Sequence, residues 1–290
     1  MGREAARARV RSDRGAYNEC VSARPALRVF SLLVGCALLL PVPALVADQV
    51  PVRHLQGLLH GFLVLRDLDD KLLASGSWIQ FANGNRVTSE LSFHFHDGSV
   101  HQETTVFRQR RIFQLLSYHL VQKGPAFKRA MDMSLNASTG QVNIKYSDDD
   151  GKEKTIAERL KLPVDLANGL VITLLGDIDP KLPKTVVSML VATPKPRLVK
   201  LELSPLGEDS FWFGGTAAKA MRYAVKVEIG GISGVLAPIL GKQPPDTHVW
   251  IVGGKAPGFL KSEGPLFQGG PVWRTELASP VWSKASSGQQ

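Results

Sequence analysis

Cysteine is almost missing from this sequence, which has only Cys20 and Cys36 among its 290 residues. Both precede residue 48, so the rest of the chain has no thiol that could attack a substrate, bind a metal or form a disulfide. A domain of this size can bury a core large enough to fold without disulfides. Cysteine-based catalysis and cysteine metal sites are therefore excluded for the larger part of the chain.

A long uninterrupted apolar run is also missing. The most apolar stretch is Val29–Ala47, and Pro41 and Pro43 interrupt it. Seven arginines precede this stretch, at positions 3, 7, 9, 11, 14, 24 and 28. A basic region followed by a short apolar one is typical of a secretory signal peptide, and the run is too short and too broken to span a membrane comfortably. We predict that residues 1–47 are a signal peptide, that the mature N-terminus falls between Leu45 and Asp48, at Leu45 or at Asp48, and that the mature chain has no transmembrane segment.

Export to the periplasm or secretion follows from this prediction. The alternative is a lipoprotein, because Leu33-Val34-Gly35-Cys36 resembles the motif whose cysteine is lipidated. In a lipoprotein the cysteine closes the apolar stretch, whereas here residues 37–40 continue it. We therefore favour a cleaved periplasmic or secreted protein over one anchored at Cys36.

A strong surplus of one charge is lacking as well. The formal net charge is +9, and without residues 1–47 the chain keeps 28 basic and 23 acidic residues, a net charge of +5. The basic residues are scattered between apolar ones, without the dense patch or interleaved aromatic residues that nucleic-acid binding requires. Nucleic acid is therefore not an expected partner.

What the sequence does contain, from residue 58 onward, is alternation of apolar and polar residues. Val142, Ile144 and Tyr146, for example, alternate with polar neighbours. Such one-sided strands are typical of antiparallel sheets. Asn83-Gly84 and Asp97-Gly98 lie between strand-like runs and are strong hairpin signals. The pattern predicts a meander over residues 57–158, and strands resume over Thr185–Leu277.

One segment has helical spacing instead. Residues 162–175 carry apolar side chains at 166, 167, 170, 171, 174 and 175, with Pro163 at the start. We predict one amphipathic helix there, although Asn168-Gly169 weakens the pattern. The predicted fold is mostly β: a large curled antiparallel sheet or open β-barrel with this helix packed on it. Residues 48–282 would form a single β-rich domain, and residues 283–290 a polar C-terminal tail.

The strongest cluster of chemically versatile residues surrounds Asp97-Gly98. If these two residues form the loop of a hairpin, His94, His96 and His101 share one face with Glu103, while Phe93, Phe95 and Val100 fill the other. Opposed residues on one face lie about 5 Å apart at Cβ, close enough for His94 and His101 to share an ion. His94, His96 and His101 are therefore the candidate metal ligands, and zinc would suit them.

Two interpretations of this cluster remain. One is a zinc-dependent enzyme of the hydratase or hydrolase type, and His94-Phe95-His96 with the later His119 resembles the zinc-binding strands of α-type carbonic anhydrases. The other is a polar hairpin face exposed to water, which is far commoner, so that replacing His94 and His101 by alanine would cost within about 0.5 kcal/mol. A three-residue loop at 109–111 places His119 opposite His101, and a two-residue loop places it opposite Val100.

The C-terminal third is rich in aromatic residues separated by turns: Trp250, Phe259, Phe267, Trp273 and Trp282. We expect most of these rings to lie in the core. The alternative is a mouth that binds a lipid, a glycan or a peptide, as β-barrel mouths commonly do.

The chain also resembles an uncharacterised family of exported bacterial proteins. The likeness is carried by residues 162–170, 192–199, 237–246, 263–265 and 270–273. It implies an envelope protein of β-rich fold, and it assigns no functional residue.

No complete catalytic motif occurs, so no catalytic residue and no cofactor is predicted. We expect a non-catalytic cell-envelope protein whose β scaffold binds an apolar or amphiphilic ligand, such as a lipid or a glycan. The alternatives are the zinc enzyme described above, with zinc as its cofactor, and a structural partner of envelope complexes.

Overall fold

The computed structural model describes residues 48–192, 195–213, 216–228 and 244–278, all within the unit Leu45–Gln290. The predicted signal peptide, Trp282 and the predicted tail lie outside the described residues. The helix is α1 (Val171–Asp177). The strands are β1 (Leu59–Arg66), β2 (Leu72–Asn83), β3 (Arg86–Phe95), β4 (Val100–Gln109), β5 (Phe113–Lys123), β6 (Met131–Asn136), β7 (Gln141–Ser147), β8 (Glu153–Arg159), β9 (Thr185–Ala192), β10 (Pro196–Phe213), β11 (Thr216–Glu228), β12 (Thr247–Val252), β13 (Gly258–Pro265) and β14 (Val272–Leu277).

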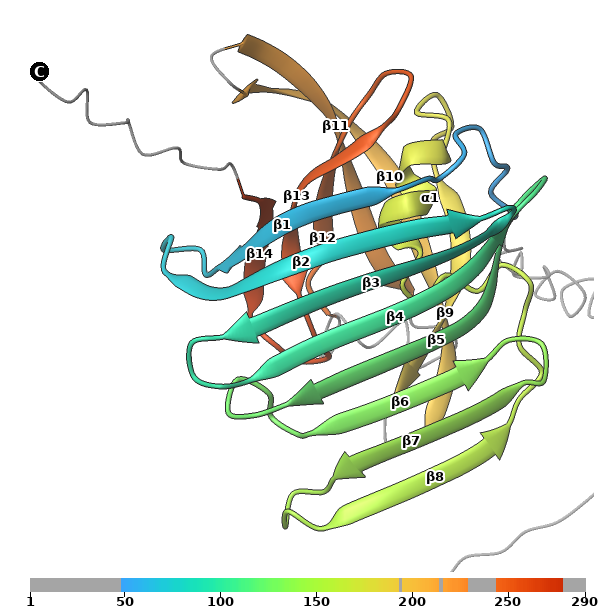
Figure 1. The fold of residues 1–290 in the computed structure, drawn as a ribbon, viewed down its shortest axis with the longest axis vertical. Helices are drawn as coiled ribbons and strands as arrows, with labels where there is room; N and C mark the ends of the chain where they lie inside the picture. The colour runs from blue at the N-terminus through green and yellow to red at the C-terminus, as the bar shows by residue number, and fades with distance from the viewer. Residues whose placement is uncertain (1–47, 193–194, 214–215, 229–243, 279–290) are drawn as a thin grey trace, which may run out of the picture. The chain divides into compact units, whose positions relative to one another are not determined.

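All of these strands form one antiparallel sheet, ordered β8-β7-β6-β5-β4-β3-β2-β1-β14-β13-β12-β11-β10-β9 (Figure 1). Strands β1–β8 are a continuous meander, which confirms the meander predicted over residues 57–158. Strands β9–β14 form a second meander, and β1 pairs with β14 where the two halves meet. The predicted fold class, a mostly β protein with a large antiparallel sheet and one helix, is confirmed.

The sheet curls, so that side chains from its two halves meet in one core (Figure 1). The ring of Phe95 on β3 lies 5.5 Å from that of Trp273 on β14, and Trp78 on β2 meets Phe259 on β13 edge-on at 6.1 Å. Such edge-to-face contacts add to the apolar area that the rings bury. Trp250 is also buried. The expectation that most C-terminal rings belong to the core holds for those that the structure describes.

The helix is shorter than predicted, because α1 begins only at Val171. Gly169 adopts φ +68°, a left-handed conformation that stops a helix from extending through the preceding residues. The apolar positions of the pattern are nevertheless buried or partly buried against the sheet: Leu166, Ala167, Leu170, Val171, Leu174 and Leu175. The periodicity therefore identified the buried face correctly and the extent of the helix wrongly.

Residues 48–56 run across one end of the curled sheet and connect its two halves. Asp48 donates its backbone N–H to Val186 on β9, while the backbone of Val50 and Val52 pairs with the β4–β5 turn near Phe113. We call residues 48–56 the N-terminal strap. Because its hydrogen bonds reach both halves, the strap helps to hold the curl closed at this end.

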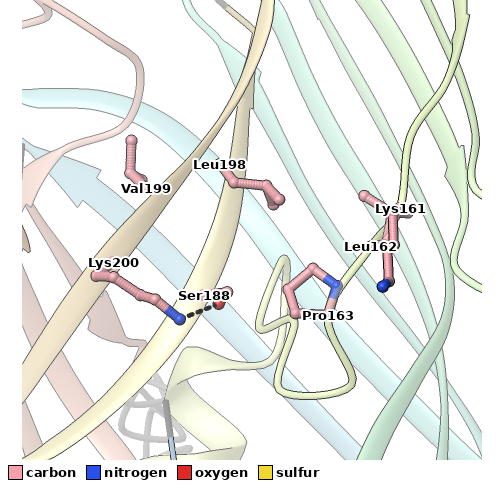
Figure 2. A pocket seen from close by; sticks show the side chains of 7 residues that line it. All are labelled: Lys161, Leu162, Pro163, Ser188, Leu198, Val199 and Lys200. Carbon is pink, nitrogen blue, oxygen red and sulfur yellow. Dashed lines mark hydrogen bonds between the residues drawn. The ribbon is translucent and has the colours of Figure 1, made fainter. Parts of the chain in front are cut away.

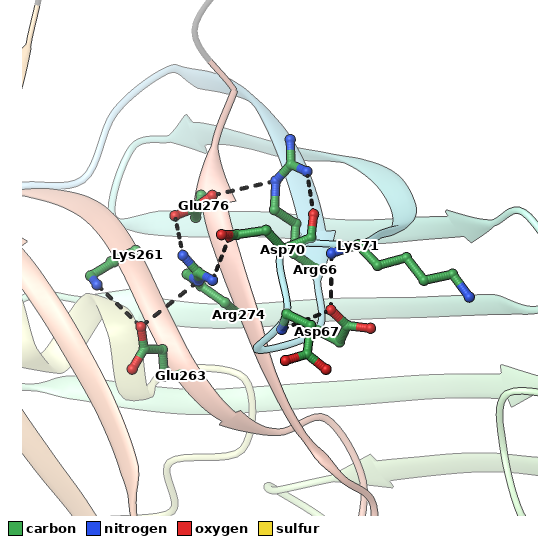
Figure 3. A network of polar contacts seen from close by, with 9 residues as sticks. Arg66, Asp67, Asp70, Lys71, Lys261, Glu263, Arg274 and Glu276 are labelled. Atoms are coloured by element: carbon green, nitrogen blue, oxygen red, sulfur yellow. Dashed lines mark hydrogen bonds and ion pairs between the residues drawn. The ribbon is translucent and has the colours of Figure 1, made fainter.

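A network of charged side chains spans the junction between the halves (Figure 3). Arg274 on β14 contacts three carboxylates: Asp70 at 2.8 Å, Glu276 at 3.7 Å and Glu263 at 3.8 Å. Arg66 on β1 reaches Glu276 at 3.8 Å. Exposed ion pairs contribute little one by one, but this network links β1, β13, β14 and the β1–β2 turn.

Candidate functional site

The hairpin that carries the histidines has a three-residue loop. Phe95 donates its backbone N–H to Ser99 at 2.9 Å, which leaves His96, Asp97 and Gly98 in the loop, with Gly98 at φ +85°. The Asp97-Gly98 pattern predicted a two-residue loop. One extra loop residue shifts the register by one position and moves every later side chain to the other face. His101 therefore pairs with Phe93 and not with His94.

This register corrects the predicted grouping of His94, His96 and His101 on one face. His94 and His96 are exposed, whereas His101 points inward and is 0% exposed. Phe93 and Phe95 are buried as predicted, and Val100 is only partly buried, because it shares the outer face with His94. In the part of the chain that the structure describes, no three histidine or carboxylate side chains are grouped as metal ligands. The geometry on which the zinc alternative was based is therefore absent.

His119 also differs from both predicted positions. It pairs with Thr104, because the loop after β4 and a bulge near Val106 shift the β4–β5 register. Its side chain is half exposed, and Nε2 lies 2.9 Å from the carboxylate of Asp132 on β6. His119 thus lies on the outer face, as Val100 does, and is opposite neither His101 nor Val100.

His101 is the centre of a buried polar chain instead. Its Nδ1 accepts a hydrogen bond from the Gln122 amide at 3.0 Å, and its Nε2 lies 2.9 Å from a carboxylate oxygen of Glu103. Burial, followed by the charge of Glu103 and a hydrogen bond to it, raises the pKa of Tyr118 well above its ordinary value. Phe127 stacks on the imidazole. Sequence reasoning missed Gln122 and Tyr118, because their place beside His101 depends on the β4–β5 register.

A small pocket beside β9 contains a serine next to a lysine (Figure 2). The pocket is about 280 Å³, and Lys200 donates to the Ser188 hydroxyl at 2.9 Å. A serine nucleophile would need a neutral base and free oxyanion donors. The Ser188 hydroxyl instead donates to the Asp165 carboxylate at 2.7 Å, and its backbone N–H is bonded to the Asp165 carbonyl. These contacts fix the segment before α1 to the edge strand β9, so Ser188 and Lys200 have a structural role.

A second cavity is a cleft of about 470 Å³ between α1, the N-terminal strap and the inner face of β10–β12. Ligand sites typically have volumes of this size. Apolar side chains dominate its walls, and charged ones lie among them. The lining residues are Arg53, His54, Leu175, Gly176, Ile178, Pro180, Glu208, Lys219, Met221, Tyr223, Ile251, Gly253, Gly254 and Pro257. We call this cavity the α1 cleft.

Charged groups of the α1 cleft are held in exposed pairs. Lys219 lies 3.2 Å from Glu208, and Arg53 lies 3.4 Å from Asp179. Exposed pairs of this kind are weak, so a ligand with a polar end can exchange them for its own contacts at little cost. The cleft thus combines apolar walls with charges that are available to a bound molecule.

Asp177, the last residue of α1, fixes the strap beside the α1 cleft. One oxygen of its fully buried carboxylate accepts the backbone N–H of Arg53 at 2.6 Å and that of His54 at 2.7 Å. Burial raises the pKa of this carboxyl, although both N–H bonds and the charges of His54 and Arg53 oppose the shift. Two lining residues are therefore positioned by one buried acid, which the sequence pattern did not indicate.

No protein-family model matches the chain, and no curated protein matches it. Its fold is similar to the crystal structure of a β-barrel-like protein of domain of unknown function DUF1849 from Brucella abortus. The two share 10% sequence identity, and the alignment covers 82% of this chain and 100% of the other with a TM-score of 0.42. The family of this chain stays unassigned, and its predicted export stays a prediction. In the described part of the chain, no helix is long and apolar enough to cross a bilayer.

Proposed function

We propose that this protein is an exported cell-envelope protein that binds an apolar or amphiphilic ligand in the α1 cleft. The observation that carries the proposal is the cleft itself, a cavity of about 470 Å³ with walls such as Leu175, Met221 and Ile251. Burying apolar area there contributes about 25 cal/mol per Å² to ligand affinity. The signal-like sequence of residues 1–47 supports export.

The polar groups favour an amphiphile over a purely apolar ligand. Arg53 and Lys219 line the same cavity as the apolar side chains, so a chain with a polar head group satisfies both parts of the lining. A glycan would need more hydrogen-bonding groups on the walls than the cleft has. Among the described residues, the predicted metal ligands His94, His96 and His101 do not share one face, so the geometry does not support the zinc enzyme.

Titration with laurate, a single-chain amphiphile, tests the proposal by calorimetry. Gly253 lines the cleft, its φ is outside the left-handed region, and a Cβ added there meets no atom within 4 Å. Gly253→Phe should therefore fold and partly fill the cavity. We expect it to bind laurate at least about tenfold more weakly, the equivalent of losing one well-buried apolar group.

Gly57→Phe is the matched control, because Gly57 has equally open surroundings and does not line the cleft. It should bind laurate as the wild type does. Absence of laurate binding by the wild type, together with purification from the envelope without any bound small molecule in native mass spectrometry, would refute the proposal. Equal affinities of both glycine variants would place the site elsewhere.

A further inference from the structure

The hairpin β10–β11 is longer than the strands beside it. Pairing of β10 with β9 stops at Leu203, and pairing of β11 with β12 stops at Ala220. The two strands continue to pair with each other as far as Phe213 and Thr216. Among the described strands, this outer part of the hairpin therefore has no lateral neighbour, and Figure 1 shows it reaching past the sheet at the top of the view.

We call the described end of this hairpin, Ser210–Phe213 on β10 and Thr216–Ala218 on β11, the tip. It has no charged residue, and its β10 side contains the three consecutive aromatic residues Phe211-Trp212-Phe213. Trp212 is 77% exposed, more than any other described tryptophan, phenylalanine or tyrosine. A tryptophan in this position leaves most of its apolar surface in water, which is unfavourable. Exposed apolar patches mark protein or membrane contact sites, and Trp212 lies in a tip that has no charged residue.

Charged residues begin directly behind the tip. Glu208 lies 3.2 Å from Lys219, and Asp209 lies 3.6 Å from Arg222. The uncharged part covers three residue steps on β10, Ser210 to Phe213, or about 10 Å at the rise of an extended strand. This length matches the depth of roughly 5–10 Å to which interfacial segments enter a bilayer. Tryptophan is also the residue type that bilayer interfaces favour.

A protein partner fits this feature less well. A ribbon two strands wide and about 10 Å long presents a face on the order of 100 Å². A stable protein–protein interface needs about 800 Å² on each partner. A bilayer needs no matching surface and can bind a narrow apolar tip, and the net charge of +5 that the chain keeps without residues 1–47 favours an anionic surface.

We infer that the β10–β11 tip inserts into the interface of a lipid bilayer, with Trp212 as its anchor. Glu208 and Lys219, at the base of the tip, also line the α1 cleft, so docking would bring the cleft next to the membrane. The inference stands on the hairpin alone, and the proposed function supplies only the reason for docking.

Flotation with vesicles of phosphatidylethanolamine and phosphatidylglycerol tests the inference on the full chain. Trp212→Ser should lower the partition coefficient of the protein between vesicles and water about tenfold, because it removes one large apolar side chain from the interface. Phe62→Ser is the control, since Phe62 on β1 is 63% exposed but lies outside the hairpin. It should float like the wild type, and so should Gly253→Phe, whatever its effect on laurate binding.

Residues 1–47 are the same in every variant, so their own affinity for lipid cancels in these comparisons. A second measurement places Trp212 directly: vesicles with brominated acyl chains should quench wild-type fluorescence more strongly than that of Trp212→Phe. Equal quenching, or equal flotation of Trp212→Ser and wild type, would overturn the inference. So would a dimer in sedimentation analysis that Trp212→Ser abolishes, because the tip would then contact a second copy of the chain.

Discussion

The backbone N–H of His54 donates to the Asp177 carboxylate at 2.7 Å, and the side chain of Asp177 has no exposed surface. The second carboxylate oxygen and the Nδ1 of His54 are both buried without a hydrogen-bond partner among the described residues. The strap is therefore attached to α1 through an ionisable group that is costly to bury in its charged form.

The first prediction concerns pH. Burial raises the pKa of Asp177 in the folded protein above its ordinary value of 3.8, so the folded state binds this proton more tightly than the unfolded chain does. The stability that Asp177 contributes is thus fully present below the unfolded pKa and is lost as the pH rises through the folded pKa. Asp177→Asn cannot titrate. The melting temperature of the wild type minus that of Asp177→Asn should increase when the pH is lowered from neutral to about 4.

Subtraction of the variant is necessary, because other carboxyl groups act in the opposite direction. Hydrogen bonding to Lys184 lowers the pKa of Glu202, and hydrogen bonding to Arg129 lowers that of Asp149, so both pairs lose stability on acidification. These effects are common to both proteins and cancel in the difference. A difference that shrinks at acid pH would contradict the raised pKa of Asp177.

The second prediction separates two histidines of one hairpin. His101→Ala removes a buried ring together with its hydrogen bonds to Glu103 and Gln122, which should cost roughly 2–5 kcal/mol in the free energy of unfolding. His94→Ala, on the exposed face, should stay within about 0.5 kcal/mol. Urea denaturation measures both. Similar small losses for both variants would instead support the register predicted from the sequence, in which the two side chains share a face.

The histidine hairpin shows where prediction from the sequence ended. Alternation and turn residues identified the strands of β1–β8, and the burial of Phe93 and Phe95 followed from them. The face of His101 did not, because Asp97-Gly98 suits both a two-residue loop and a three-residue loop that ends in a left-handed glycine. The α1 cleft could not be predicted from the sequence either, since its walls come from the strap, α1 and β10–β12, which are far apart in sequence.

The third prediction concerns Asn168, whose side chain forms hydrogen bonds with the backbone of β9, as a neighbouring strand would. Its side-chain amide donates to the Leu190 carbonyl at 2.8 Å, and its side-chain oxygen accepts the Leu190 N–H at 2.9 Å. Asn168→Leu keeps the branched shape and the number of side-chain heavy atoms but leaves both buried backbone groups without partners, so we expect a loss of roughly 2–5 kcal/mol in chemical denaturation. Val164→Ala, nearby and 43% exposed, should cost far less. A neutral Asn168→Leu would mean that water or another group replaces the amide.

The last prediction concerns the close contact between Gly76 on β2 and Phe93 on β3, which are register partners. A Cβ added to Gly76 would lie 2.4 Å from the Ser92 carbonyl oxygen and 2.5 Å from the Phe93 ring. Because the carbonyl belongs to the backbone, Gly76→Ala must displace β3, and we expect a loss of roughly 1–3 kcal/mol.

Gly258→Ala is the control for this substitution, because the added Cβ at this strand position meets no atom within 4 Å. It should be neutral or stabilising by up to about 1 kcal/mol, since alanine restricts the unfolded chain. Combining Gly76→Ala with Phe93→Leu tests which contact dominates. Removal of the ring relieves only the side-chain clash, so the double variant should stay less stable than Phe93→Leu alone. If the two were equally stable, the ring and not the Ser92 carbonyl would be what requires glycine at position 76.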